Sequence, residues 1–266
     1  MSEDEVFVTI GALVAGPVWW TFTLIGLGRV TTLRRGAAGV QALTVTISVC
    51  ALGILAILKT VASFDVVDAP EYQFMYGVLG LAWLRLAAIF FAFAGLSVRD
   101  DLVERRNTAT VPAVAGAFVG LTLCYAGGNI GDGPGWWVVV FSAGLASAML
   151  FAAWLILAQF SSAMDAMTID RDPSAGVRVG AFLAACGLVL GRVVAGDWYS
   201  VGDTLTDAAA GLPALVVILV AALLAERMAR PTPERPHASM LLFGIVPAFL
   251  YLAIAAGAVS AMEWPP

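Results

Sequence analysis

The sequence predicts an all-α polytopic membrane protein: a helix bundle of eight transmembrane helices in four parallel helical-hairpin repeats. Composition is the first observation, because the 266 residues are 61% hydrophobic and only 12% charged, with a mean hydropathy of +0.91. A soluble domain would carry about a quarter charged residues. The second observation is a regular series of long apolar stretches, and the third is that the charges between them alternate in sign.

Eight stretches are long enough to cross a bilayer, which takes roughly 20 mainly apolar residues. The predicted spans cover approximately residues 6–28, 37–59, 74–97, 108–127, 135–161, 174–195, 207–226 and 238–261. The acidic start, MSEDEV, lacks the basic region of a signal peptide, so we expect a retained first helix. Because the links are short, sequence neighbours should be antiparallel and adjacent in space.

Prolines and small residues predict local features inside the spans. Pro17, Pro213 and Pro247 should kink their helices, because proline removes a backbone hydrogen bond. Small residues at four-residue spacing allow helices to approach closely in lipid. This spacing is seen for Gly116 with Gly120, Gly144 with Ala148 and Ala152, and Gly187 with Gly191.

The distribution of charge predicts the orientation of the spans. Alternate links hold eleven of the fourteen cations, namely Arg29, Arg34, Arg35, Arg99, Arg105, Arg106, Arg171, Arg178, Arg227, Arg230 and Arg235. The other links and both termini carry acids, namely Glu3, Asp4, Glu5, Asp65, Asp68, Glu71, Asp132, Asp197, Asp203, Asp207 and Glu263. Because Lys and Arg stay cytoplasmic, the sequence predicts a multi-pass protein of the bacterial cytoplasmic (inner) membrane with both termini non-cytoplasmic.

The four predicted cytoplasmic turns share a pattern. They read RRGAAG at 34–39, RRNTAT at 105–110, RDPSAG at 171–176 and RPHASM at 235–240. Aligned on Gly36, Asn107, Pro173 and His237, they are spaced by 71, 66 and 64 residues. This period predicts four hairpin repeats in the same orientation. We therefore expect two four-helix halves, residues 1–133 and 134–266.

Each turn has the composition of a helix start. Asn107 and Asp172 are suitable N-caps, and Pro173 suits a first helical position. One interpretation is that each turn is only a capped helix start, preceded by arginines that keep this end of the helix in the cytoplasm. The other is a cytoplasmic docking or anion site, in which helix N-termini converge with arginines. Its candidate residues are Arg35, Arg105, Arg106, Asn107, Arg171 and Asp172.

Two blocks of the chain resemble domain-of-unknown-function family 350, also known as UPF0719. They are RDDLVERRNTATVPAVAGAFVGLTLCYAGGNI at 99–130 and DRDPSAGVRVGAFLAACGLVLGRVVAGDW at 170–198. The family signature, R/K-N-x-A-A-G, falls on Arg106, Asn107, Thr108 and Ala109, and again on Arg171, Asp172, Ser174, Ala175 and Gly176. Gly36, Pro173 and His237 stand where the family has asparagine.

This resemblance is clearest over residues 99–198. Members are small bacterial inner-membrane proteins of about four helices, so the resemblance implies a tandem doubling. It implies no established activity. It does imply an association with polyamine-synthase-like or amidoligase-like proteins, which are often encoded nearby.

Arg85 is the candidate for an intramembrane polar site. It lies near the middle of the third span, where an arginine costs a few kcal/mol and needs a partner or water. Either a conduction pathway or a structural arginine fits this position. Candidate partners on the second span are Gln41, Thr44, Thr46 and Ser48.

Several kinds of site are not expected. Cys50, Cys124 and Cys186 sit singly in apolar segments, and His237 is the only histidine, so we expect no metal site and no haem. The glycine-rich stretch at 125–137 lacks the Lys-Ser/Thr ending of a phosphate loop. No catalytic triad or carboxylate pair can be assembled within the spans. The sequence thus predicts neither an enzyme nor a cofactor.

Two functions remain open. The preferred one is an accessory or assembly subunit that docks a cytoplasmic protein partner through its arginine-rich turns. The alternative is a channel or transporter for a small solute or anion with Arg85 in the pathway. The lipid bilayer is an expected partner, nucleic acid is not, and a homo-oligomer stays open.

Overall fold

The computed structural model of the chain describes residues 1–34, 38–230 and 239–262. Within these ranges every regular element is a helix, and eight helical stretches are long and apolar enough to cross a membrane. The prediction of an all-α bundle with eight apolar spans is therefore confirmed.

The helices follow one another with short links. Their order and bounds are α1 (Glu3–Leu13), η1 (Val14–Val18), α2 (Trp19–Arg34), α3 (Ala38–Thr60), α4 (Phe64–Val67), α5 (Pro70–Phe93), η2 (Val98–Glu104), η3 (Thr108–Thr110), α6 (Val111–Gly127), α7 (Trp136–Phe160), α8 (Ala163–Thr168), α9 (Pro173–Val193), α10 (Val201–Ala210), α11 (Leu212–Ala229), η4 (Leu241–Ile245) and α12 (Val246–Ala261).

Each predicted proline irregularity falls where two helical segments join. Pro17 lies inside η1, a π-helical turn between α1 and α2. Pro213 is the second residue of α11, and Pro247 is the second residue of α12, which follows directly on the π-helical η4. A proline lacks the N–H that a continuous helix needs, so the backbone changes its hydrogen-bonding pattern there.

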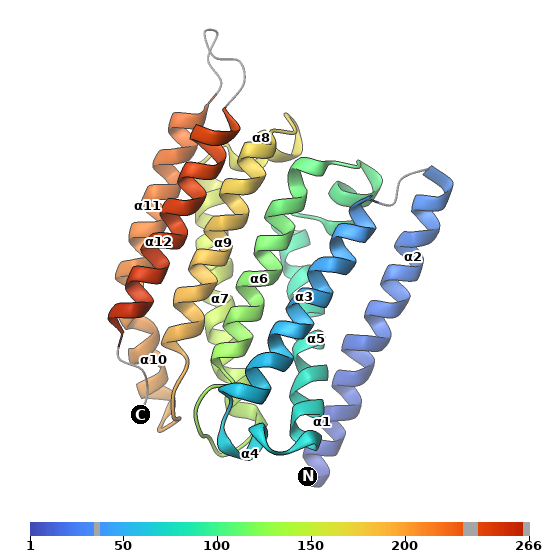
Figure 1. Cartoon of the computed structure of the whole chain (residues 1–266), viewed down its shortest axis with the longest axis vertical. Helices are drawn as coiled ribbons and strands as arrows, with labels where there is room; N and C mark the ends of the chain where they lie inside the picture. The colour runs from blue at the N-terminus through green and yellow to red at the C-terminus, as the bar shows by residue number, and fades with distance from the viewer. Residues whose placement is uncertain (35–37, 231–238, 263–266) are drawn as a thin grey trace.

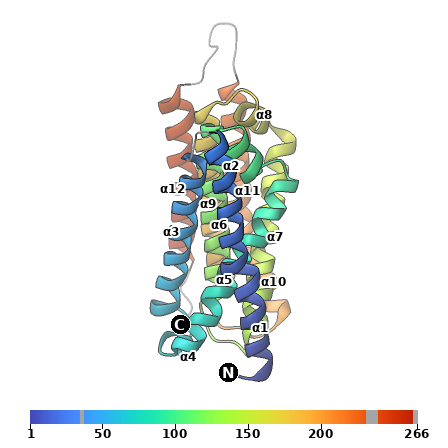
Figure 2. The same ribbon diagram turned by 90° about the vertical axis from the view of Figure 1, so that its right-hand side faces the viewer.

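Four long helices lie side by side: α3 contacts α6, α6 contacts α9, and α9 contacts α12 (Figure 1). Behind this row in the same view lie α5, α7 and α11, which contact their neighbours in the row (Figures 1 and 2). The first span covers α5 through α1 and η1, and α2 then runs on toward the turn η2.

Glycines at the α6–α9 interface let the two backbones touch. Gly116 lies against the backbone of Gly180, Gly120 against Gly187, and Gly127 against Gly191. The predicted close approach is thus confirmed at these small residues. It is wrong for Gly144, whose nearest neighbour is the ring of Trp83, 3.6 Å from the position of an added Cβ.

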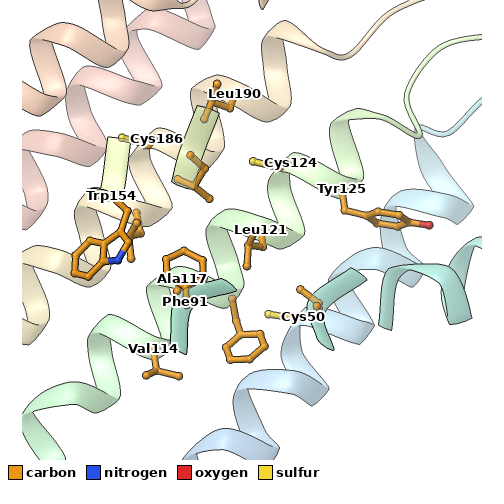
Figure 3. Close-up of a cluster of buried hydrophobic side chains, with 14 of the residues drawn as sticks. Cys50, Phe91, Val114, Ala117, Leu121, Cys124, Tyr125, Trp154, Cys186 and Leu190 are labelled. Atoms are coloured by element: carbon orange, nitrogen blue, oxygen red, sulfur yellow. The ribbon is translucent and has the colours of Figure 1, made fainter. Parts of the chain in front are cut away.

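Apolar side chains fill the space on both sides of this central pair. Figure 3 shows Cys124 and Tyr125 on α6, Cys186 on α9 and Cys50 on α3 within one buried cluster. All three cysteines are buried and unpaired, as expected of small apolar residues.

The two ends of the bundle differ in charge. The end at which α8 lies, called the α8 end below, carries the links α5–α6 and α7–α9 (Figure 1). The end at which α4 lies, the α4 end, carries the N-terminus and the links α6–α7 and α9–α10. The two links at the α8 end therefore carry arginines together with acids, whereas the two links at the α4 end carry acids and no Lys or Arg.

Candidate functional site

The first turn of the candidate site runs from Ser97 to Thr110 at the α8 end. Its backbone hydrogen bonds include three that define the turn: Asp101 N–H donates to Ser97 O at 3.0 Å, Arg105 N–H to Asp100 O at 2.8 Å, and Asn107 N–H to Asp101 O at 2.9 Å. Asn107 Oδ1 then accepts the N–H of Ala109 at 3.1 Å. Asn107 is thus the N-cap predicted from the sequence.

The second turn, from Ser162 to Ser174, repeats this pattern 65 residues later. Ala166 N–H donates to Ser162 O at 2.9 Å, Asp170 N–H to Asp165 O at 3.0 Å, and Asp172 N–H to Ala166 O at 2.8 Å. Asp172 Oδ1 accepts the N–H of Ser174 at 2.9 Å. The counterpart of Asn107 is therefore Asp172, and the alignment of Asn107 with Pro173 was wrong by one residue.

Both turns hold an arginine in the left-handed region of backbone space. Arg106 has φ 51° and Arg171 has φ 55°, and both side chains are exposed. A non-glycine residue costs roughly 1–2 kcal/mol in this conformation. Glycine or asparagine would adopt it at lower cost, so the turn geometry alone does not explain the choice of arginine.

Two hydrogen bonds join the turns to each other. Asn107 Nδ2 donates to Met167 O at 2.8 Å in a buried contact, and Arg171 Nη2 donates to Arg105 O at 3.3 Å. The structure therefore brings Arg105, Arg106, Asn107, Arg171 and Asp172 together at one end of the bundle. Arg35, the remaining candidate, lies outside the described residues.

Carboxylates balance much of the positive charge in these turns. Arg99 pairs with Glu104 at 2.9 Å, and Arg105 pairs with Asp101 at 3.4 Å. Burial raises the pKa of the Asp101 carboxyl above its ordinary value, although the Ser97 amide and the Arg105 guanidinium oppose this shift.

The balance of charge does not favour a simple anion site. Residues 97–110 carry three arginines and three carboxylates, and residues 161–174 carry one arginine and three carboxylates. In addition, the Asp172 carboxylate already occupies the N-terminus of α9, where an anion would bind. The described surface is of mixed charge.

Arg85 contacts aromatic rings instead of the polar residues expected on the second span. Its Cζ lies 4.9 Å from the ring centroid of Trp19 and 5.7 Å from that of Trp20. Trp20 is fixed in turn by a hydrogen bond from its Nε1 to Leu81 O at 3.0 Å. These are cation–π distances, so part of the cost of placing Arg85 in the span is offset by the rings.

Arg85 also borders a groove between α2, α5 and η2. The groove has a volume of about 690 Å³ and extends to Arg99 and Ser97 at the α8 end. Its walls include apolar side chains such as Phe22 and Ile89. The Nε of Arg85 is buried and has no hydrogen-bond partner among the described residues.

The structure contains a buried ion pair that the sequence does not predict. The prediction that Arg178 lies in a cytoplasmic link is wrong, because Arg178 lies inside α9 and its side chain is 2% exposed. Its Nε donates to Glu226 Oε1 at 2.7 Å and its Nη2 to Oε2 at 3.0 Å. Nη1 donates to Phe243 O in η4 and to Ser174 Oγ. The pair links α9, α11 and η4 near the α8 end.

The sequence did contain a signal for this pair. Glu226 is an acid at the last position of the predicted span 207–226, and an acid within the membrane requires a partner. The helical pattern shows which residues share a face with Glu226. It does not show that the partner is Arg178, which lies 48 residues away in the sequence.

Among the described residues, no group of three His, Cys, Asp or Glu side chains is close enough to hold a metal ion. The comparisons with known proteins also give no guide, since no family model, no curated protein and no solved structure matches the chain. The resemblance to family 350 stays a prediction.

Proposed function

We propose that the chain is an accessory or assembly subunit of a bacterial inner membrane, which docks a cytoplasmic protein through the two turns at the α8 end. One observation carries the proposal. Arg106 and Arg171 occupy the same strained backbone position in two hydrogen-bonded turns, with exposed side chains. Glycine or asparagine would adopt this backbone conformation with less strain, so the arginine side chains themselves are the reason to infer a function.

The mixed charge of the turns favours a protein partner over a lipid surface. Anionic lipid would attract a patch of uniform positive charge. Here Arg99 and Arg105 are paired with carboxylates, while Asp165 and Asp170 lie in the second turn. A protein can match such an alternating pattern with charges of both signs, and this complementarity provides specificity.

The proposal includes a topology. The α8 end faces the cytoplasm, both termini face away from it, and the four hairpins are parallel repeats divided at residues 133 and 134. The common hydrogen-bonding pattern of the two turns, 65 residues apart, supports the repeat.

Removing the two strained arginines should release the partner. In Arg106→Asn with Arg171→Asn, asparagine tolerates the left-handed backbone, so the turns should remain folded without the charges. We expect at least about a tenfold loss of co-purified partner, because anchoring residues dominate an interface. Recovery would be measured by quantitative mass spectrometry after purification in mild detergent. A photo-crosslinker at the exposed Thr108 would establish direct contact.

Arg227→Asn is the control, since Arg227 is exposed at the α8 end but lies in α11, outside the two turns. This variant should keep the partner, and Lys at positions 106 and 171 should keep part of it. Unchanged recovery with the double asparagine variant would contradict the proposal. The proposal would also be contradicted if the double asparagine variant bound anionic vesicles less well than the wild type but still crosslinked to the same proteins.

A channel or transporter for a small anion is the second candidate, and the groove that ends at Arg85 is the observation that favours it. Its route would lie between α2 and α5, because the backbones of α6 and α9 touch. The Nε of Arg85 is buried and has no hydrogen-bond partner among the described residues, so the guanidinium could attract an anion there.

Under this second candidate, Arg85→Leu should lower anion flux into liposomes by at least about tenfold, since the charge stabilises the anion in a low-dielectric site. Flux would be measured with an anion-sensitive dye inside the vesicles. Arg227→Leu is the control, because Arg227 is exposed at the α8 end and does not line the groove. Equal flux through the wild type and Arg85→Leu would exclude this route.

A further inference from the structure

The α4 end contains a small acidic pocket that neither proposed function uses. Its volume is about 80 Å³. Five carboxylates from separate parts of the chain line it, namely Glu5 in α1, Asp65 in α4, Asp132 in the α6–α7 link, Asp197 in the α9–α10 link and Asp207 in α10. No Lys or Arg is among the described residues of the lining.

The lining of the pocket includes a buried amide whose oxygen has no partner among the described residues. Asn129 is 5% exposed and follows the end of α6. Its Nδ2 is directed back along the helix and donates to Tyr125 O at 2.8 Å. Its Oδ1 is buried and has no hydrogen-bond partner in the described part of the chain. Leaving a buried acceptor unpaired is unfavourable by about 1–3 kcal/mol.

The chemistry of the lining calls for a cation that donates hydrogen bonds. The lining also holds a buried N–H donor without a partner, Nε1–H of Trp198, together with the unpaired amide oxygen and the five carboxylates. The described side chains do not form a metal-ligand cluster. An ammonium group suits these conditions, because its three N–H donors can reach oxygens that are too far apart to coordinate one metal ion.

We propose that this pocket binds a small primary ammonium cation, with Asn129 Oδ1 accepting one N–H and the carboxylates stabilising the charge. The site lies at the opposite end of the bundle from the docking turns. Its existence therefore does not depend on the proposed docking function.

Binding would be tested by calorimetric titration of the full chain in detergent with methylammonium. We expect saturable binding to the wild type. Asp65→Asn and Asp207→Asn change exposed residues and should each raise the dissociation constant about three- to tenfold, because one attractive charge is lost. Asn129→Leu should raise it about tenfold or more, provided that thermal unfolding shows an intact fold.

Two comparisons make the result specific. Asp68→Asn removes an exposed charge at the same end but outside the pocket, and it should leave the dissociation constant unchanged. Tetramethylammonium has the same charge but no N–H, so it should bind at least about tenfold more weakly. No saturable heat with the wild type, an equal loss in Asp68→Asn, equal affinity for tetramethylammonium or tighter binding of Ca²⁺ would each overturn the proposal.

Discussion

Arg178→Leu is expected to lower the free energy of unfolding by about 3–5 kcal/mol, because it leaves the Glu226 carboxylate buried without its partner. Both side chains are almost fully enclosed, at 2% and 3% exposure, and they form two charge-assisted hydrogen bonds. The bond from Arg178 to Phe243 O would also be lost. Unfolding in detergent micelles, followed by circular dichroism, would measure the change.

Two further variants separate charge from packing. Arg178→Leu with Glu226→Leu should recover most of the lost stability, since a buried pair can be replaced by apolar residues at little cost. Arg99→Leu breaks an ion pair whose arginine side chain is 69% exposed, so it should change stability by less than about 1 kcal/mol. If Arg178→Leu behaved like Arg99→Leu, the buried pair would have no structural role.

Gly180→Val should destabilise the bundle by about 3 kcal/mol or more, because its side chain would meet the backbone of Pro112 across the α6–α9 interface. Backbone atoms cannot move aside as a flexible side chain can, so the helices would have to separate. The α6–α9 pair is the most extensive helix contact in the described chain, and the loss should appear in global unfolding. The same unfolding assay measures it.

Gly53→Ala is the matched control for the interface glycine. Gly53 lies within α3 and has no atom within 4 Å of an added Cβ, so alanine there should stabilise the helix by about 0.5–1 kcal/mol. Gly116→Ala, whose added carbon meets the backbone of Gly180, should destabilise. If Gly53→Ala and Gly116→Ala changed the free energy of unfolding by similar amounts, helix propensity and not the contact between α6 and α9 would explain both changes.

Features that depend on local chemistry could be predicted from the sequence. Asn107 and Asp172 were expected as N-caps and Pro173 as a first helical residue, and all three are found there. A cap depends only on the side chain and the next few backbone amides, so its signal is contained within a few residues. The same holds for Pro17, which breaks the regular helix at its own position.

Features that depend on distant parts of the chain were predicted less well. The sequence indicated that Arg85 needs a partner but favoured polar groups on the second span, whereas the rings of Trp19 and Trp20 lie over it. Gly144 has the spacing of a packing residue, yet it faces a tryptophan ring. Spacing tells which residues share a face of a helix and not which helix lies opposite.

The sequence by itself determined the class of the protein, its eight apolar spans, the capped starts of η3 and α9 and the placement of most arginines in alternate links. Each follows from hydrophobicity or from hydrogen bonds between near neighbours. Only the tertiary structure decided that α6 and α9 form the central pair, that Arg178 meets Glu226 and that five carboxylates remote in the sequence line one pocket with Asn129. Such contacts depend on which helix faces are apposed in space, because in lipid apolar surface alone does not select a partner.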